Sequence, residues 1–368
     1  MTNEVYDLCN FDTNLTKILM TFKSNLIGFV FTIFLIQSCT TDPLNVDVSG
    51  SELEIEFINM DSILGNSSAD QILKHHRKWL VEIPETYEYQ RVYCLQINSN
   101  VDSQVVTGIQ NFYKDPFAKR AHAAIAKQFS NLNNEKQQLL NGFKHLKHHF
   151  NEGKIPSKIV FINSCFNVNS LSTTKEIAIG LDRNLDFKTD VIKELPGSYF
   201  PSWIKEAWNR DFLVRDAICS WVMTHYVLPK NDVNGNAEFN WGVNCNLAEN
   251  IVRWGKILYL TKAALPEVSN AIILRYSEED YKWAQDNEVS FWKYLVDQSL
   301  LFKKDELMVA NLLNDGPFTV GLPEKGPDRL GQYLGFRLIE EYVKNKGCSP
   351  LELLNTDYSE IITNYEID

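Results

Sequence analysis

The spacing of apolar positions changes its period several times along this chain. Residues 52–58, ELEIEFI, alternate acidic and apolar positions, which is the pattern of a strand with one buried face. From 69 to 150 the apolar positions instead recur three and four residues apart, as in the stretch PFAKRAHAAIAKQF. This spacing is typical of amphipathic helices. We therefore expect a strand followed by a long helical region.

A second region of strands follows Pro156. The β-branched runs KIVFIN (158–163) and KEIAIGLD (175–182) are separated by a polar segment, and we interpret them as neighbouring strands of a small sheet. Helical spacing then returns in four long stretches, at 203–227, 246–265, 277–302 and 329–345. Strands first and helices after predict an α+β fold, predominantly helical with a small β-sheet, rather than alternating βαβ units.

The apolar segment at 26–36 has the features of an export signal. It is too short to span a bilayer, which needs about 20 helical residues, and it follows Lys17 and Lys23. It ends in LIQSC, which resembles a bacterial lipobox closing on Cys39. We predict that the Cys39 thiol is acylated and becomes the N-terminus after cleavage. The alternative is an ordinary secretory signal with an incidental cysteine.

These features divide the chain into three parts. Residues 1–38 are interpreted as a lipoprotein signal peptide, 39–51 as a tether and 52–368 as a single α+β domain. Met20 is an alternative start, because the residues before it carry three acidic side chains that do not suit a basic leader. A lipid on Cys39 would attach the domain to a membrane without spanning it.

Charge and the residues after the cysteine bear on partners and location. The formal net charge is −11, so we expect no attraction to phosphate backbones and no nucleic-acid partner. No acidic run follows Thr40 directly. We therefore expect an outer-membrane lipoprotein that faces the periplasm.

The histidines of KHLKHHF are the most obvious candidate metal ligands. His145 is three residues from His148 and four from His149, so on a helix it could share a face with either one and bind a transition metal. A zincin helix, however, needs HExxH, and Leu146 stands where the glutamate should be. We expect a solvated helix face. The alternative is a zinc-dependent peptidase or hydrolase with an unorthodox metal site.

A second stretch matches part of a zinc-protease motif. Laid over HExxH, residues 248–252 keep Glu249 but have Ala248 and Val252 at the histidine positions. Alanine and valine offer no lone pair to zinc, so we expect no metal and no cofactor here. In the same scheme Glu288 of NEVSFW would be a third ligand. An ordinary amphipathic helix explains the same residues without a lost site.

Gly331 and Gly335 form a GxxxG spacing in RLGQYLGF. The charged and polar neighbours Arg329, Gln332 and Arg337 rule out a helix that faces lipid. We expect these glycines to allow close packing against another helix inside a soluble domain.

Three stretches together resemble the GldB family of gliding-motility-associated lipoproteins. They are 253–305, DGPF at 315–318 and 326–343. The similar motifs are Gly-Lys-x-Leu-Tyr (255–259), Trp-Ala-x-x-Asn-Glu (283–288) with Trp292, Leu-Leu-Phe (300–302) and Arg-Leu-Gly-x-x-Leu-Gly (329–335). The chain departs from the family at Asp328, where the family usually has glycine after the proline.

The resemblance implies an envelope lipoprotein of gliding bacteria, associated with the motility and protein-secretion apparatus, with no established catalytic residue. The family also resembles, distantly, predicted zinc proteases that carry HExxH. It therefore implies a zincin-like, gluzincin-type scaffold without its metal ligands. We interpret the protein as non-catalytic and expect its scaffold to bind envelope proteins of the gliding machinery.

Overall fold

The computed structural model describes residues 43–151, 153–227, 245–322 and 326–365. Val46–Asp368 form one compact unit, distinct from the residues up to Asn45, and the fold below is that of the larger unit. The predictions for the leader, Met20 and Cys39 lie outside the described residues. Within the described residues, no helix has both the length and the apolar character needed to cross a membrane.

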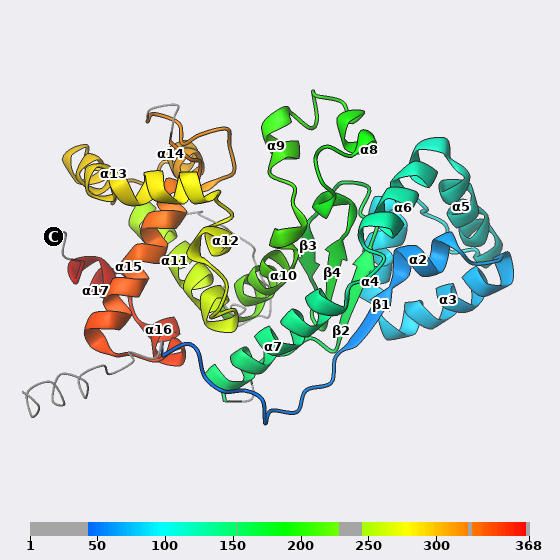
Figure 1. The fold of residues 1–368 in the computed structure, drawn as a ribbon, viewed down its shortest axis with the longest axis horizontal. Coiled ribbons are helices and arrows are strands. Elements are labelled where there is room, and N and C mark those ends of the chain that lie inside the picture. The colour runs from blue at the N-terminus through cyan, green and yellow to red at the C-terminus, as the bar shows by residue number, and fades with distance from the viewer. Residues whose placement is uncertain (1–42, 152, 228–244, 323–325, 366–368) are drawn as a thin grey trace, which may run out of the picture. The chain divides into compact units, whose positions relative to one another are not determined.

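A four-stranded sheet lies at the centre of the fold (Figure 1). Its strands are β1 (Glu56–Asn59), β2 (Lys158–Ile162), β3 (Ser170–Ser172) and β4 (Glu176–Gly180), in the order β1-β2-β4-β3. The pairs β1-β2 and β2-β4 are parallel, and β3 is antiparallel to β4. The two strands predicted after Pro156 are thus confirmed as neighbours. The first strand is shorter than predicted, because its pairing begins only at Glu56 opposite Lys158.

A long helical region lies between the first strand and the later ones, as the spacing at 69–150 predicts. A chain of helices separates β1 from β2: α2 (Met60–Gly65), α3 (Ala69–Glu82), α4 (Pro84–Glu88), the π-helix η1 (Tyr89–Cys94), α5 (Asp102–Lys114), α6 (Pro116–Gln128) and α7 (Asn133–His149). The helical pattern at 69–150 is confirmed. Since β1 and β2 are parallel, this region forms the crossover that parallel neighbours require.

The rest of the fold is helical. After the sheet come the 3₁₀-helix η2 (Asp182–Asn184), α8 (Asp190–Lys193), α9 (Ser202–Glu206), the 3₁₀-helix η3 (Arg210–Phe212), α10 (Leu213–Val222), the π-helix η4 (Met223–Val227), α11 (Leu247–Ala264), α12 (Asn270–Leu274), α13 (Glu278–Asp297), α14 (Glu306–Leu313), α15 (Leu330–Lys346), α16 (Pro350–Asn355) and α17 (Tyr358–Thr363). The stretch predicted as one helix at 203–227 is divided. Its break lies at Asn209, whose side chain accepts a hydrogen bond from the backbone N–H of Asp211 and begins η3.

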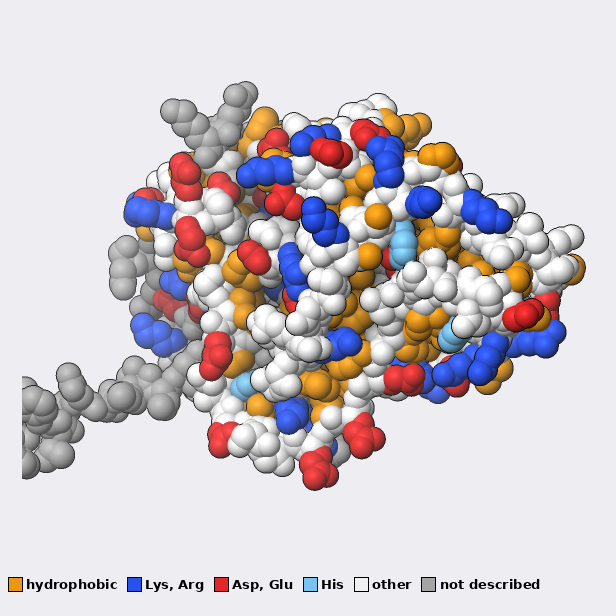
Figure 2. Space-filling model, turned by 45° about the vertical axis from the view of Figure 1, so that its right-hand side comes forward, with side chains coloured by type: hydrophobic (Ala, Val, Ile, Leu, Met, Phe, Trp, Pro, Cys, Tyr) orange, Lys and Arg blue, Asp and Glu red, His pale blue; other side chains and the backbone are white. Residues whose placement is uncertain are grey.

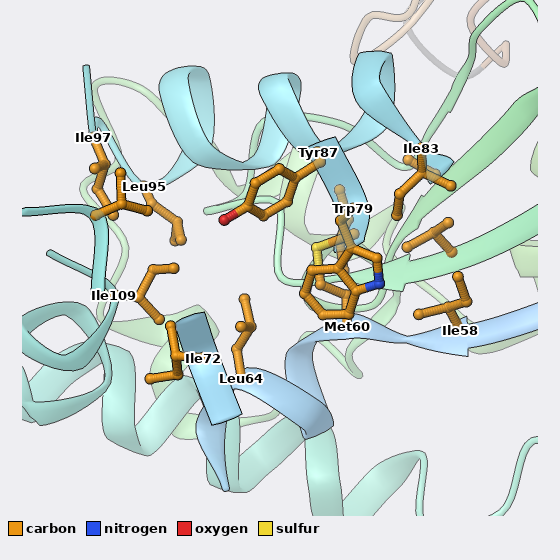
Figure 3. Close-up of a cluster of buried hydrophobic side chains, with 14 of the residues drawn as sticks. Ile58, Met60, Leu64, Ile72, Trp79, Ile83, Tyr87, Leu95, Ile97 and Ile109 are labelled. Atoms are coloured by element: carbon orange, nitrogen blue, oxygen red, sulfur yellow. The ribbon is translucent and has the colours of Figure 1, made fainter. Parts of the chain in front are cut away.

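Both faces of the sheet are buried. On one face, Val160, Ile162 and Ala178 join a core with Trp79 and Tyr87 from the helices between β1 and β2 (Figure 3). On the other face, α10 packs against β3 and β4. Successive residues of β2 and β4 therefore pack on opposite faces of the sheet, and both faces are buried. This explains why these strands are apolar along most of their length rather than alternating apolar and polar residues.

The GxxxG glycines lie where helices approach closely, as predicted. A Cβ on Gly331 would lie 2.7 Å from a methyl carbon of Leu313 in α14. Gly335, one turn later, faces α11. Close packing of α15 against its neighbours inside the domain is therefore confirmed.

The surface carries charges of both signs. On the face shown in Figure 2, acidic and basic side chains are interspersed and apolar side chains are visible between them. Basic side chains gather along the lower right edge of this view, together with several acidic ones. Charges of both signs are thus mixed on this face, and a local excess of one sign has to be identified from the residues of each site.

Candidate binding cleft

The residues that match part of HExxH lie in the first turns of α11 and have structural roles. The side chain of Asn246 accepts a hydrogen bond from the Glu249 N–H (2.8 Å), and the Glu249 carboxylate accepts one from the Asn246 N–H (2.7 Å). This reciprocal pair is a capping box. Ala248 and Val252 are buried. Glu249 thus has a complete structural explanation as a helix cap.

Glu249 and Val252 also line a small pocket of about 170 Å³ beside Lys256. The Lys256 ammonium donates to the carbonyl oxygens of Leu354 (3.2 Å) and Thr356 (2.6 Å). Burial lowers the pKa of Lys256 to about 8. The lysine therefore connects α11 to the C-terminal end of α16.

Glu288 on α13 belongs to a hydrogen-bond network rather than to a group of metal ligands. Its carboxylate accepts hydrogen bonds from the Tyr333 hydroxyl (2.5 Å) and the Tyr365 hydroxyl (2.6 Å), and from the Arg337 Nε (3.1 Å). Both carboxylate oxygens are used. Glu288 thus connects α13 to α15 and to the last described residues of the chain.

The three histidines of KHLKHHF occupy the last turns of α7 but do not share one environment. His148 is exposed, whereas His145 is buried on the same side as Phe143 and Leu146, so the predicted solvated face is only partly present. Burial lowers the pKa of His145. The rings of His145 and His149 are 6.4 Å apart. Across the described ranges, no three His, Cys, Asp or Glu side chains are grouped so that they could bind a metal ion.

A larger cavity with polar lining lies elsewhere. It is a cleft of about 670 Å³ between α9 with Trp208, the turn from α12 to α13, and the segment that precedes α15. Its lining includes three arginines, Arg183, Arg275 and Arg329. No residue predicted as a metal ligand from the sequence contributes to it.

Arg275 connects two walls of this cleft. Its Nη2 donates to the carbonyl oxygen of Ala207 (2.9 Å), and its Nη1 lies 3.3 Å from a carboxylate oxygen of Asp216 on α10. Asp216 is buried and also pairs with Arg215 (3.1 Å). Burial alone would raise the pKa of Asp216, but Arg275 and Arg215 keep it below its ordinary value. The carboxylate is therefore charged and compensates the guanidinium.

Arg329 connects the third wall of the cleft, the segment that precedes α15, to the end of α12. Its Nη1 and Nη2 donate to the carbonyl oxygens of Leu274 and Arg275, both at 3.2 Å. Its Nε lies 2.9 Å from a carboxylate oxygen of Asp328, an ion pair without the alignment of a hydrogen bond. The guanidinium also lies over the ring of Tyr276. The Arg329 guanidinium is thus held by contacts within the fold, although its Nε has no aligned hydrogen-bond acceptor.

Arg275 and Arg329 share an uncommon backbone conformation. Their φ angles are +56° and +54°, in the left-handed region that non-glycine residues rarely adopt. Such residues persist where the surrounding contacts determine the backbone, and they are concentrated at functional sites. The contacts of the fold therefore fix the backbone conformation of this cleft wall.

The mouth of the cleft is acidic. Glu206, Glu278 and Asp315 are exposed and line it, together with the half-buried Trp203. In total, five carboxylates and three guanidiniums of the described residues line the cleft. Arg275 and Arg329 have carboxylate partners, and the carboxylates of the lining outnumber its guanidiniums, so the net charge of the described lining is negative.

Sequence patterns did not reveal this cleft, because its residues extend from Arg183 to Arg329. Two stretches of the sequence nevertheless contain residues of the cleft. The stretches DGPF and GPDR, both singled out for the family resemblance, provide Asp315, Gly316 and Asp328 to the cleft wall.

Comparison with known families shows to which family the chain belongs. The family described as gliding motility protein GldB matches residues 41–366. The chain belongs to the GldB family. Comparison with curated proteins and with solved structures gives no match. The GldB match extends across all three walls of the cleft, so the cleft lies within the GldB domain.

Proposed function

We propose that this GldB-family chain is a non-catalytic, lipid-anchored protein of the cell envelope that serves gliding motility by binding a partner protein in the cleft. The observation that carries the proposal is the cleft itself, whose walls are connected by Arg275 and Arg329 in strained conformations. Its partners would be envelope proteins of the gliding machinery and its secretion apparatus.

The roles of the former candidate ligands support the non-catalytic part. The Glu249 carboxylate caps α11, and the Glu288 carboxylate accepts hydrogen bonds on both oxygens. A catalytic zinc site normally uses three protein ligands with free lone pairs. We propose that α11 belongs to a degenerate zinc-protease-like scaffold, in which Ala248 and Val252 replaced the two histidines.

The anchoring part rests on the lipobox-like sequence before Cys39. A lipoprotein of this kind bears several acyl chains, which are enough for stable attachment. We propose the outer membrane, facing the periplasm, as its location.

The proposal is tested in a gliding bacterium whose own copy has been deleted, complemented with single variants. Cys39→Ala is expected to leave the membrane fraction and to abolish gliding. Ala207→Trp, which places a bulky side chain at the exposed Ala207 in the cleft, is expected to abolish gliding while the protein stays membrane-bound. Normal gliding of Ala207→Trp would contradict a binding role of the cleft.

The non-catalytic part needs a separate measurement. The fragment 40–368, purified without a histidine tag or chelator, is expected to contain less than about a tenth of an equivalent of zinc. Near one equivalent, lost together with gliding when His145, His148 and His149 are replaced by glutamine, would instead establish the zinc-dependent hydrolase.

A further inference from the structure

Two of the three exposed carboxylates at the cleft mouth, Glu206 and Glu278, have no partner among the residues that the structure describes. Glu206 ends α9 and Glu278 begins α13, and both side chains are exposed. Within the described part of the chain, neither carboxylate takes part in a hydrogen bond or an ion pair. Asp315, the third exposed carboxylate, has one ion-pair contact, 3.3 Å from the Arg329 Nε. Negative charge at the mouth is therefore available to a ligand.

The three guanidiniums that line the cleft already form contacts within the fold. The Arg183 Nε donates to the side chain of Asn169 (2.9 Å) and its Nη1 to the carbonyl oxygen of Phe166 (3.1 Å). Its guanidinium lies over the Trp208 ring, 4.8 Å from the centroid. Arg275 and Arg329 have carboxylate partners in Asp216 and Asp328. An anionic ligand would therefore have to compete with contacts that already exist.

Apolar side chains line the same cleft as the mouth carboxylates. Trp203, Ile204 and Ile272 are half-buried and line the same cleft, and Pro317 is exposed there. A lysine or arginine side chain has an apolar stem and a charged end, and it is attracted both to carboxylates and to an indole face. A cleft lined by both exposed carboxylates and an indole thus matches the chemistry of a basic side chain.

We propose that the cleft receives an extended segment of its partner protein and binds a lysine or arginine side chain of that segment through Glu206, Glu278 and Asp315, with Trp203 against the stem. This inference rests on the proposed function of the cleft and adds the chemistry of the partner. Charge complementarity of this kind speeds association and selects partners, and it weakens with salt.

The test uses the fragment 40–368 and octalysine as the probe, with octaglutamate and octaserine as comparisons. Octalysine is expected to bind and to change the fluorescence of Trp203, whereas the other two peptides are not. The double variant Glu206→Gln/Glu278→Gln is expected to bind octalysine about tenfold more weakly at low salt. Glutamine is nearly isosteric, and both positions are exposed, so the variant should fold.

A matched control removes the same net charge elsewhere. Glu279→Gln/Glu88→Gln changes two exposed glutamates that do not line the cleft, and it is expected to bind octalysine as the wild type does. Equal weakening in both double variants, no binding of octalysine, or tighter binding of octaglutamate would each overturn the inference.

Gliding assays separate this inference from the proposed function. If Ala207→Trp stops gliding and Glu206→Gln/Glu278→Gln does not, the cleft binds its partner but not through a basic side chain, and the inference fails alone. If both variants glide normally, the cleft has no role in gliding and the proposed function fails. Loss of gliding in both, with the control double variant normal, supports both.

Discussion

Gly255 of α11 and Gly335 of α15 meet where the two helices cross, with no room for a side chain on either. A Cβ on Gly335 would lie 2.1 Å from the carbonyl oxygen of Ile251, and one on Gly255 would lie 2.1 Å from the carbonyl oxygen of Gly335. Both obstacles are backbone atoms, which cannot rotate away as a flexible side chain can. The helices can therefore pack this closely only with glycine at both positions.

We predict that Gly335→Ala lowers the free energy of unfolding by about 3 kcal/mol, because the helices must separate or the backbone must shift. Chemical denaturation of the fragment 40–368 measures this. Gly197→Ala is the control, since a Cβ there meets nothing within 4 Å, and it should change stability by less than about 1 kcal/mol. A loss below about 1 kcal/mol for Gly335→Ala would show that the crossing is looser than described.

The contact between Arg329 and the Arg275 carbonyl leads to a second prediction. Arg329→Lys keeps the positive charge but loses the planar group that reaches two carbonyl oxygens at once. At least one of the two acceptors, of which the Leu274 oxygen is buried and the Arg275 oxygen partly buried, then loses its donor, and we expect the free energy of unfolding to fall by about 2 kcal/mol. Thermal and chemical unfolding measure it.

Arg77→Lys is a suitable comparison for Arg329→Lys. Arg77 also pairs with a carboxylate, that of Asp102 at 2.7 Å, but its side chain is 66% exposed. An exposed pair contributes about 0 to 1 kcal/mol, so Arg77→Lys should be nearly neutral. Similar losses of unfolding free energy in the two variants would mean that the contacts of Arg329 in the cleft wall contribute no more than an exposed ion pair.

The elements that could be predicted from sequence are those whose pattern is local. KIVFIN and KEIAIGLD are runs of buried β-branched residues, and the glycines of RLGQYLGF have the spacing of a close helix crossing. The strand β3 escaped prediction because its three residues, Ser-Leu-Ser, lie in a polar segment and are all half-buried. The crossover between β1 and β2 could not be predicted either, because parallel pairing depends on how all the intervening helices pack.

The cleft is a feature of tertiary structure alone. Nothing in the residue types of Arg275 and Arg329 indicates a left-handed backbone, which glycine or asparagine would adopt at lower cost. Their contacts are distant in sequence: Arg275 donates to the carbonyl oxygen of Ala207, 68 positions away, and Arg329 donates to that of Leu274, 55 positions away. The partial match to HExxH at Ala248 to Val252, by contrast, can be found in the sequence, but its Glu249 caps a helix.

That cap leads to a third prediction. Glu249→Gln keeps an acceptor oxygen for the Asn246 N–H, so its stability should stay within about 0.5 kcal/mol of the wild type, whereas Glu249→Ala should lose about 1 kcal/mol. Denaturation of both variants measures the difference. If Glu249→Gln abolished gliding without a loss of stability, the carboxylate would have a chemical role beyond the cap.

A fourth prediction concerns pH and the pair formed by His122 and Asp61. The His122 Nδ1 lies 2.8 Å from a carboxylate oxygen of Asp61, whose other oxygen accepts from the Tyr113 hydroxyl. The hydrogen bond to Asp61 raises the pKa of His122, although burial opposes it. A raised pKa in the folded state means that protonated His122 stabilises the fold. This contribution is complete below pH about 6.5 and is lost as pH rises through the folded pKa.

We therefore expect the stability difference between the wild type and His122→Gln to shrink as pH rises above about 6.5, since glutamine donates to Asp61 but does not titrate. His145→Gln provides the opposite case. Burial lowers the pKa of His145, so the wild type should lose stability relative to His145→Gln as pH falls below about 6.5. Unfolding free energies measured from pH 5.5 to 8.5, with NMR titration of the His122 ring, test both slopes. A His122 pKa below about 6.5, or a difference that does not vary with pH, would show that the Asp61 contact does not favour the charged ring.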